Sequence, residues 1–431
     1  MMRLITILSV FAISLPGFAS VPLDLPQAIE MALANNPDVR IAAGQVAASE
    51  ALLEQSKAAF RPQIGLQSSY TRTNMPMQSF GAILNQSAFH PEIDFNDPGE
   101  VDNLNVTGSV RYRLYNGGQS KAGVEASKEV RDATGYQAEA VRRQIVFAVE
   151  RAWHQIMQAH ELAASQASAV SAMEGNLRVA QLQYDAGKFL KTEVLNLEVQ
   201  LARAMENKLQ ADSQAELACE ALFNLLGVSG GEKGQWTGRL PDPASLPDTE
   251  PAPGERPEVL AAKAAVAAAE HNLSRVKGGH LPTVDAFASL QYDQGFEMDA
   301  GGDSWMAGVV LNLPIYDAGV TRNRVKEAEA HLRVANERLR KAELGIGLEI
   351  RSARIAWSNA RETLVVTDKM VEQAEESANL SRQRFETGVI LSSELIDVEN
   401  RLTEARMRRA LAITQLQIAW ADLKRALGTP Q

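Results

Sequence analysis

The chain has 431 residues, a formal net charge of −10 and a single cysteine. The negative charge argues against a nucleic-acid partner, because DNA and RNA attract positively charged proteins. One cysteine excludes an internal disulfide. Beyond the N-terminal region no run of about 18 apolar residues occurs, so the sequence predicts no transmembrane helix.

The first 19 residues predict a secretory signal peptide. Arg3 provides a positive start, residues 4–11 form an apolar segment, and Gly17-Phe18-Ala19 is a small-residue cleavage site. Cleavage after Ala19 leaves no cysteine at the new N-terminus, so we expect no lipid anchor of the bacterial lipoprotein type. A buried N-terminal strand is the alternative interpretation of residues 1–19.

The remaining sequence contains an internal repeat. Matching landmarks lie about 220 positions apart in the early part of each half and about 201 apart later, so the first half holds an insert of about 19 residues. We divide the chain into a first repeat (20–227), a Gly- and Pro-rich connecting segment (228–256) and a second repeat (257–431). The landmark pairs are Asn36-Pro37 and Arg256-Pro257, Pro62 and Pro282, Tyr115-Asn116-Gly117-Gly118 and Tyr316-Asp317-Ala318-Gly319, Gly187 and Gly388, and Leu226-Gly227 and Leu427-Gly428.

The first repeat predicts, in order, helix, strand, loop, strand and two helices. Composition favours a helix at 25–60, which Pro62 ends. Residues 63–71 and 104–114 alternate apolar and polar side chains, as strands do, and 74–102 between them is rich in Pro and Gly and is expected to be a long loop. A helix at 121–184 is about 65 residues or roughly 100 Å long. A second helix follows at 192–226, and both carry apolar residues at the 3-4 spacing of a coiled coil.

The second repeat predicts the same order of elements. A helix at 258–277 is ended by Pro282, and strands follow at 283–292 and 305–313 with a short loop at 299–303. The second long helix covers 322–385, and the last helix runs to residue 427. Leu395, Val398, Leu402 and Ala405 form its first apolar stripe.

Two short turns join the long helices, one in each repeat. Tyr184 is followed three positions later by Gly187, and Phe385 by Gly388. Glycine adopts positive φ without strain, so both glycines are expected to end a helix. Thr192 and Ser393 stand where the N-cap of the next helix is expected. Each turn therefore predicts the tip of a helical hairpin.

The predicted strands have a length and pattern that suit a membrane. Each has roughly ten residues, enough to cross a bilayer when tilted, with one apolar and one polar face. Four strands cannot close a barrel, and open edges are unstable in lipid. If these strands span a membrane, the chain must oligomerise to close them. The alternative is a sheet of a soluble protein with one face exposed to solvent.

The ordered set of landmarks resembles the TolC family of outer membrane efflux proteins, over essentially the whole mature chain. The resemblance implies an α+β membrane protein: a homotrimer whose four strands per chain form a twelve-stranded β-barrel in the outer membrane lipid, continued by a long α-helical coiled-coil barrel in the periplasm. Pro62, Gly118, Pro282 and Gly319 match the transition from barrel to helices.

The resemblance also implies partners and an entrance. The tip turns, with Tyr184, Gly187, Lys188, Gly388 and Val389, are expected to dock onto a periplasmic adaptor (a membrane fusion protein) that works with an inner-membrane RND or ABC transporter. No cofactor is implied. The predicted function is an outer membrane exit duct of a tripartite efflux or export system. The outer membrane component of type I protein secretion is the alternative with the same fold.

Family positions at the periplasmic aperture fall on Thr192, Glu193, Phe385, Glu394 and Asp397. Glu394 and Asp397 are three apart and can share a helix face, so in a symmetric trimer each forms an acidic ring that favours cations. Compensation of the helix dipole is the alternative role of these acids. The best-known family pattern has an arginine where this chain has Ile390, so we expect closure by packing and hydrogen bonds in place of that salt bridge.

No catalytic constellation or metal site is predicted. The six histidines are scattered, and His154 and His160 lie six positions apart, off the spacing of a helical metal pair. The chain is therefore not expected to be an enzyme. A periplasmic structural coiled coil or an adaptor protein is a further alternative, disfavoured by the two hairpins and the bilayer-length strands.

Overall fold

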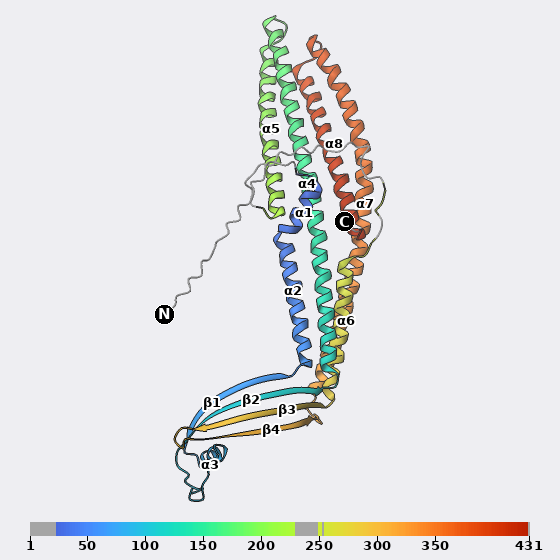
Figure 1. Cartoon of the computed structure of the whole chain (residues 1–431). Helices are drawn as coiled ribbons and strands as arrows, with labels where there is room; N and C mark the ends of the chain where they lie inside the picture. Colours follow the sequence, from blue (N-terminus) through green and yellow to red (C-terminus); the bar gives the residue numbers. More distant parts are fainter. Residues whose placement is uncertain (1–22, 229–248, 252–253, 430–431) are drawn as a thin grey trace, which may run out of the picture. The chain divides into compact units, whose positions relative to one another are not determined.

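The computed structural model describes residues 23–228, 249–251 and 254–429. The predicted signal peptide and most of the connecting segment lie outside these ranges. Among the described residues no helix combines the length and the apolar character needed to cross a bilayer. The elements, in chain order, are α1 (Leu25–Asn35), α2 (Pro37–Lys57), the 3-10 helix η1 (Ala58–Phe60), β1 (Gln63–Thr73), α3 (Pro76–Asn85), β2 (Val101–Tyr115), α4 (Gln119–Asp185), α5 (Lys191–Leu226), α6 (Pro257–Lys277), the 3-10 helix η3 (Gly278–His280), β3 (Thr283–Gly295), β4 (Ala300–Asn312), α7 (Val320–Glu386) and α8 (Ser392–Leu427) (Figure 1).

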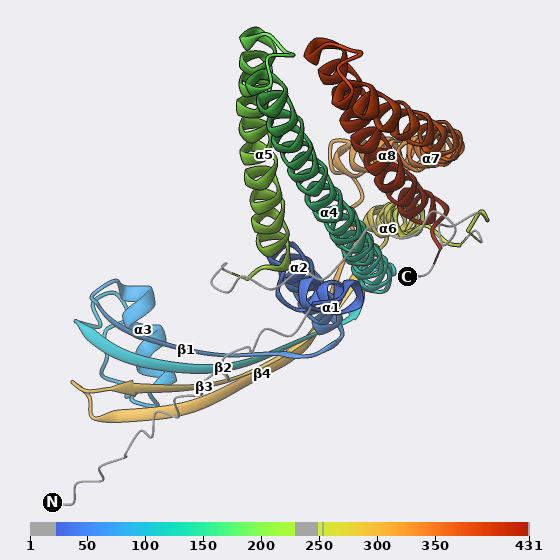
Figure 2. The same ribbon diagram turned by 90° about the horizontal axis from the view of Figure 1, so that it is seen from above.

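The internal repeat is visible in the lengths of the elements. Helices α4 and α7 have 67 residues each, α5 and α8 have 36 each, and α2 and α6 have 21 each. Both views show α4 beside α5 and α7 beside α8, which are the two predicted hairpins (Figures 1 and 2). The repeat inferred from the landmarks is therefore confirmed as a structural repeat.

The chain divides into two compact units. One contains residues 1–41, 141–255 and 347–431, with both hairpin turns, and the other contains 42–140 and 256–346, with the sheet. Helices α2, α4 and α7 contribute residues to both units.

The sheet has four antiparallel strands in the order β1-β2-β3-β4 (Figure 1). The strands have 11, 15, 13 and 13 residues, longer than the sequence predicted at most ends. Directly paired residues lie on the same face of a sheet, and the pairing keeps the predicted alternation across all four strands. One apolar row is Ile64, Val110, Ala288 and Ala307, and one polar row is Gln67, Thr107, Gln291 and Ser304.

Two predicted loops are wrong in part. Residues 76–85, expected in a long loop, form α3, because Pro76 occupies the first turn, where a missing N–H costs nothing, and the helix has an apolar residue, Ile83, to bury. Gly301, Gly302 and Asp303, also expected in a loop, belong to β4, where Gly302 pairs with Asp293. Only residues 296–299 connect β3 to β4.

The predicted helix 25–60 is broken at Asn36. Its backbone is extended (φ −59°, ψ 130°), as the residue before a proline prefers. The Asn36 side chain accepts a hydrogen bond from Asp38 N (2.8 Å) at the start of α2. It also donates to the Leu225 carbonyl (2.8 Å) at the end of α5. The Asn36-Pro37 landmark therefore marks a junction between three helices.

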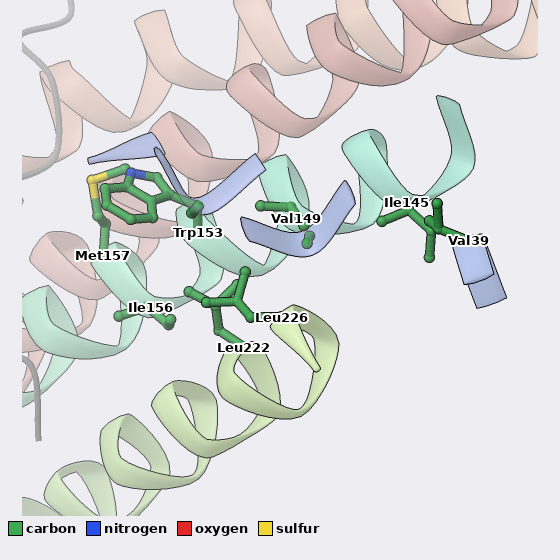
Figure 3. Close-up of a cluster of buried hydrophobic side chains, with 10 residues drawn as sticks. Val39, Ile145, Val149, Trp153, Ile156, Met157, Leu222 and Leu226 are labelled. Atoms are coloured by element: carbon green, nitrogen blue, oxygen red, sulfur yellow. The ribbon is translucent and has the colours of Figure 1, made fainter. Parts of the chain in front are cut away.

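The largest buried cluster surrounds this junction. Buried side chains from α1, α2, α4 and α5 pack together, and half of them come from α4 (Figure 3). The α4 members are Ile145, Val149, Trp153, Ile156 and Met157. Burial of such side chains contributes about 1.5–3 kcal/mol each, so this cluster fixes the base of the first hairpin.

The four predicted transition residues lie where the sheet meets the helices. Pro62 and Pro282 each stand between a 3-10 helix and a strand. Gly118 (φ 79°) and Gly319 (φ 83°) stand between a strand and a long helix, in the left-handed region that favours glycine. Asp317 accepts hydrogen bonds from the backbone N–H groups of Gly319 and Thr321, which caps the start of α7.

Candidate functional site

Both tip turns end their helices with the same backbone geometry. Gly187 (φ 73°) donates to the Tyr184 carbonyl, and Lys188 donates to Gln183. Gly388 (φ 75°) and the residue after it repeat both bonds one hairpin later. This is the Schellman arrangement, which satisfies the last helix carbonyls and needs a positive φ. The predicted role of the two glycines as helix terminators is confirmed.

The predicted N-caps are wrong. The N-cap positions are held by Leu190 and Leu391, with extended backbones and no side-chain cap. Thr192 and Ser393 lie inside the first helical turn, two residues past the N-cap position. One free N–H finds its acceptor elsewhere: Glu193 of α5 accepts a hydrogen bond from Ser392 N at 2.7 Å. A carboxylate at a helix N-terminus also interacts favourably with the helix dipole.

Aromatic and aliphatic packing joins the two turns. The rings of Phe189 and Phe385 lie with centroids 5.2 Å apart, and Phe385 is fully buried. Ile390, which replaces the family arginine, is buried in the same cluster. The Gln183 side chain adds a hydrogen bond to the Glu386 carbonyl at 3.0 Å. The cluster also contains Met173, Ala180, Val194, Leu197, Ala204 and Leu395.

Deeper in the hairpins, a buried ion pair links three helices. Arg382 of α7 donates two hydrogen bonds to Glu399 of α8, at 2.5 and 2.7 Å, and this contact raises the pKa of the Arg382 guanidinium. Asn176 of α4 donates to the same carboxylate at 3.4 Å. The sequence did not predict this group, because Val398 and not Glu399 was expected on the apolar stripe of the last helix. Glu399 lies four residues after Leu395 and three before Leu402, which is also helical spacing. This acid between two apolar residues of one helix face is the sequence feature that could have predicted a buried carboxylate.

The two predicted ring acids are on the surface of α8. Glu394 is exposed in the first turn. Asp397 forms an ion pair with Arg401 at 2.6 Å, and both side chains are more than half exposed. The arginine partly neutralises Asp397, so Glu394 is the stronger carrier of negative charge on this face. Glu394 and Asp397 thus face solvent, whereas Glu193 and Phe385 make contacts between the two turns.

The tip surface itself combines apolar and charged side chains. Tyr184, Lys188 and Val389 are all exposed, as are Leu190 and Leu391 beside them. Large apolar side chains gathered on an exposed turn indicate a contact surface. The predicted docking residues are thus available to a partner, whereas Gly187 and Gly388 shape the turns.

Metal binding is not indicated by the residues that the structure describes. They contain no group of three or more His, Cys, Asp and Glu residues that could hold a metal ion. Burial, assisted by nearby Lys424, lowers the pKa of His154 to about 4, so this ring is neutral at physiological pH. These contacts hold the two hairpin tips together: the Glu193–Ser392 and Gln183–Glu386 hydrogen bonds, the apolar cluster around Phe385, and the bond from Asn176 to the Arg382–Glu399 pair.

Over nearly its whole length the chain is similar to known proteins. The outer membrane protein TolC of Escherichia coli K12 is 22% identical over 453 residues, covering 100% of this chain and 87% of TolC. The outer membrane efflux protein BepC of Brucella suis is 24% identical over 392 residues, covering 84% and 83%.

The fold is similar to that of the outer membrane protein VceC of Vibrio cholerae. The TM-score is 0.78 at 19% identity, covering 94% of this chain and 96% of VceC. The sequence profile of the family described as "Outer membrane efflux protein" matches residues 28–228 and 251–429, which is more than half of the chain. The chain therefore belongs to the outer membrane efflux protein family.

Proposed function

We propose that three copies of this chain form a passive exit duct through the outer membrane, which receives substrates from a periplasmic adaptor and an inner-membrane pump. The observation that carries the proposal is the sheet, with membrane-length strands, one apolar face and edge strands β1 and β4 that each have one partner in the described chain. Unpaired edges are unstable in lipid, and four strands cannot close on themselves.

Closure between copies removes both edges. When β4 of one copy pairs with β1 of the next, three copies with four strands each give a barrel of twelve. The number of copies rests on the family resemblance. The apolar face then meets lipid, and the polar face lines a water-filled lumen.

Exposed apolar residues on the hairpins support the same assembly. Leu209 and Leu217 on α5, and Leu348 and Ile355 on α7, are each more than 60% exposed in the single chain. Apolar stripes of this kind on long helices are normally covered by a neighbouring helix. We place α5 of one copy against α7 of the next, which continues the barrel as a helical tunnel.

The tip turns form the entrance in this proposal. Glu394, and more weakly Asp397, contribute acidic rings that favour cations, while Glu193, Phe385 and the buried ion pair hold each chain in a closed arrangement. Lys188 and Val389 contact a membrane fusion protein that works with an RND or ABC transporter. The duct itself performs no chemistry and needs no cofactor.

Photo-crosslinking in cells tests both contacts. A photoreactive residue in place of Val389 is expected to capture a membrane fusion protein, identified by mass spectrometry. A probe in place of Leu217 is the matched control and is expected to capture a second copy of this chain. No self-adduct from Leu217 would refute the trimer, and no adaptor from Val389 would refute the docking surface. An adaptor that serves a protein-secreting ABC exporter would assign the duct to type I secretion.

A further inference from the structure

Residues 74–100 join β1 to β2, contain α3 and hold the insert of the first repeat; they fold onto the polar face of the sheet. Gln86, directly after α3, donates hydrogen bonds to the Asp102 carbonyl (2.7 Å) and to the Asn103 side chain (2.9 Å). Asn103 and Asn105 in turn donate to Asp293 at 2.6 and 2.9 Å. Asn105 and Asp293 are direct partners on the polar face. The end of α3 is therefore held by side chains of the polar face.

Glycines in β3 and β4 leave room for this contact. A Cβ atom added at Gly295 would collide with the Gln86 side chain, and one added at Gly302 would collide with the Asn85 carbonyl. Gly302 pairs with Asp293, so its missing side chain belongs to the polar face. Figures 1 and 2 both show α3 at the end of the strands where β3 turns into β4. Gly295 and Gly302 therefore leave the space that Gln86 and Asn85 occupy on the sheet.

The surface that α3 turns away from the sheet is apolar. Ser79, Ile83 and Gln86 are fully buried and form the stripe against the sheet. At about 100° per residue, Met77 and Leu84 lie on the opposite side of the helix, and they are 87% and 49% exposed. Beside them Phe80 packs against two exposed rings, Phe89 and Phe95, with centroids 5.8 and 4.3 Å away.

Lipid cannot cover this apolar surface in the proposed barrel, because the polar face is the lumen. Twelve strands at about 4.8 Å spacing and about 40° tilt give a barrel roughly 24 Å across between backbones. Three helices, each about 10 Å wide, pack within a circle of about 22 Å. Three inserts therefore fill the mouth of the barrel and bring their apolar surfaces together.

We infer that the three α3 helices of the assembled channel meet over its exit and form an apolar constriction from Met77, Leu84 and the Phe80, Phe89 and Phe95 rings. This inference rests on the proposed trimeric duct. A narrow ring of apolar side chains opposes the passage of large hydrophilic solutes, whereas it admits small solutes and apolar or amphiphilic ones. The insert is then a selectivity element at the exit of the channel.

Access from outside the cell tests the constriction. A single cysteine is placed at Ser109, which is on the polar face, in a Cys219→Ser background, and Val110→Cys on the apolar face is the matched control. With the insert intact, a small hydrophilic maleimide is expected to label Ser109→Cys, and a maleimide on a long polyethylene glycol chain is not. The large reagent is expected to label Ser109→Cys once the constriction is removed. Two changes remove it: Met77→Ser combined with Leu84→Ser, or replacement of residues 76–99 by a tight turn. Val110→Cys stays unlabelled throughout.

A cysteine at Met77 provides a second readout, because three copies near one axis are expected to form inter-chain disulfides under oxidation. Labelling of Ser109→Cys by the large reagent with the insert intact, or no disulfide from Met77→Cys, would overturn the inference. Self-capture from the Leu217 probe is measured on the same variants. If the Leu217 probe still captures a second copy, a negative result refutes the constriction and leaves the trimer intact. If the probe captures no second copy in the parent chain, the proposed trimer itself is refuted.

Discussion

The buried Arg382–Glu399 pair is expected to respond unequally to loss of its two partners. Glu399 is 3% exposed, whereas the Arg382 side chain is 33% exposed. Truncation of the arginine leaves a buried carboxylate whose remaining contact is the 3.4 Å bond from Asn176. Truncation of the glutamate leaves an arginine that can turn toward solvent.

The magnitudes follow from that difference. Breaking a buried pair costs about 3–5 kcal/mol when a charge remains buried, and partial solvent screening at Arg382 favours the lower end, about 3 kcal/mol, for Arg382→Ala. Glu399→Leu places an apolar side chain on an apolar stripe, so about 1 kcal/mol or less is expected. The double variant Arg382→Met with Glu399→Leu is expected to be close to the parent.

Hydrogen exchange in the first four turns of α8 measures this local stability. A loss of 3 kcal/mol accelerates exchange roughly 150-fold, so Arg382→Ala is expected to show that change and Glu399→Leu less than about tenfold. The assay uses the purified full chain in its assembled state, and peptides from the sheet serve as an internal reference. The reasoning is refuted if Glu399→Leu accelerates exchange as much as Arg382→Ala.

Three further predictions concern single contacts. Glu193→Ala removes the acceptor of the Ser392 N–H bond and is expected to raise closed-state conductance in planar bilayers. Glu193→Gln keeps an acceptor and should raise the conductance less. If Glu193→Ala has the conductance of the parent, closure depends on packing alone. Glu394→Gln is expected to shift the reversal potential toward weaker cation selectivity, with Asp397→Asn shifting it less. Hydrogen bonds from Thr321 and the backbone lower the pKa of Asp317. The stabilisation of α7 by Asp317 is therefore present above pH 3.8 and is lost as the pH falls through the lower pKa of the folded state. Hydrogen exchange at the start of α7 should show this pH dependence in the parent chain and not in Asp317→Asn.

Local pattern was sufficient for most of the architecture. The alternation of 104–114 predicted β2, and the glycines at 187 and 388 predicted both turns, because strand periodicity and positive φ are properties of a few neighbouring residues. Helix α3 was missed because residues 74–102 are rich in Pro and Gly, as loops are, and because the sheet that stabilises the helix is assembled from distant segments. Both N-caps were misplaced by two residues, because Leu190 and Leu391 hold those positions without a side-chain cap. The acceptor for the Ser392 N–H is Glu193, which reaches it only when the two turns lie together.

The sequence by itself determined the elements, their repetition and their apolar faces, because each depends on side chains close together along the chain. Only the tertiary structure decided which residues meet across the hairpins and on which face of the sheet the insert lies. Glu399 and Asn176 are 223 positions apart, and Gln86 meets the polar face through a network that ends at Asp293. Contacts of this kind depend on the register of strands and helices from different parts of the chain, and that register becomes fixed only when those elements pack together.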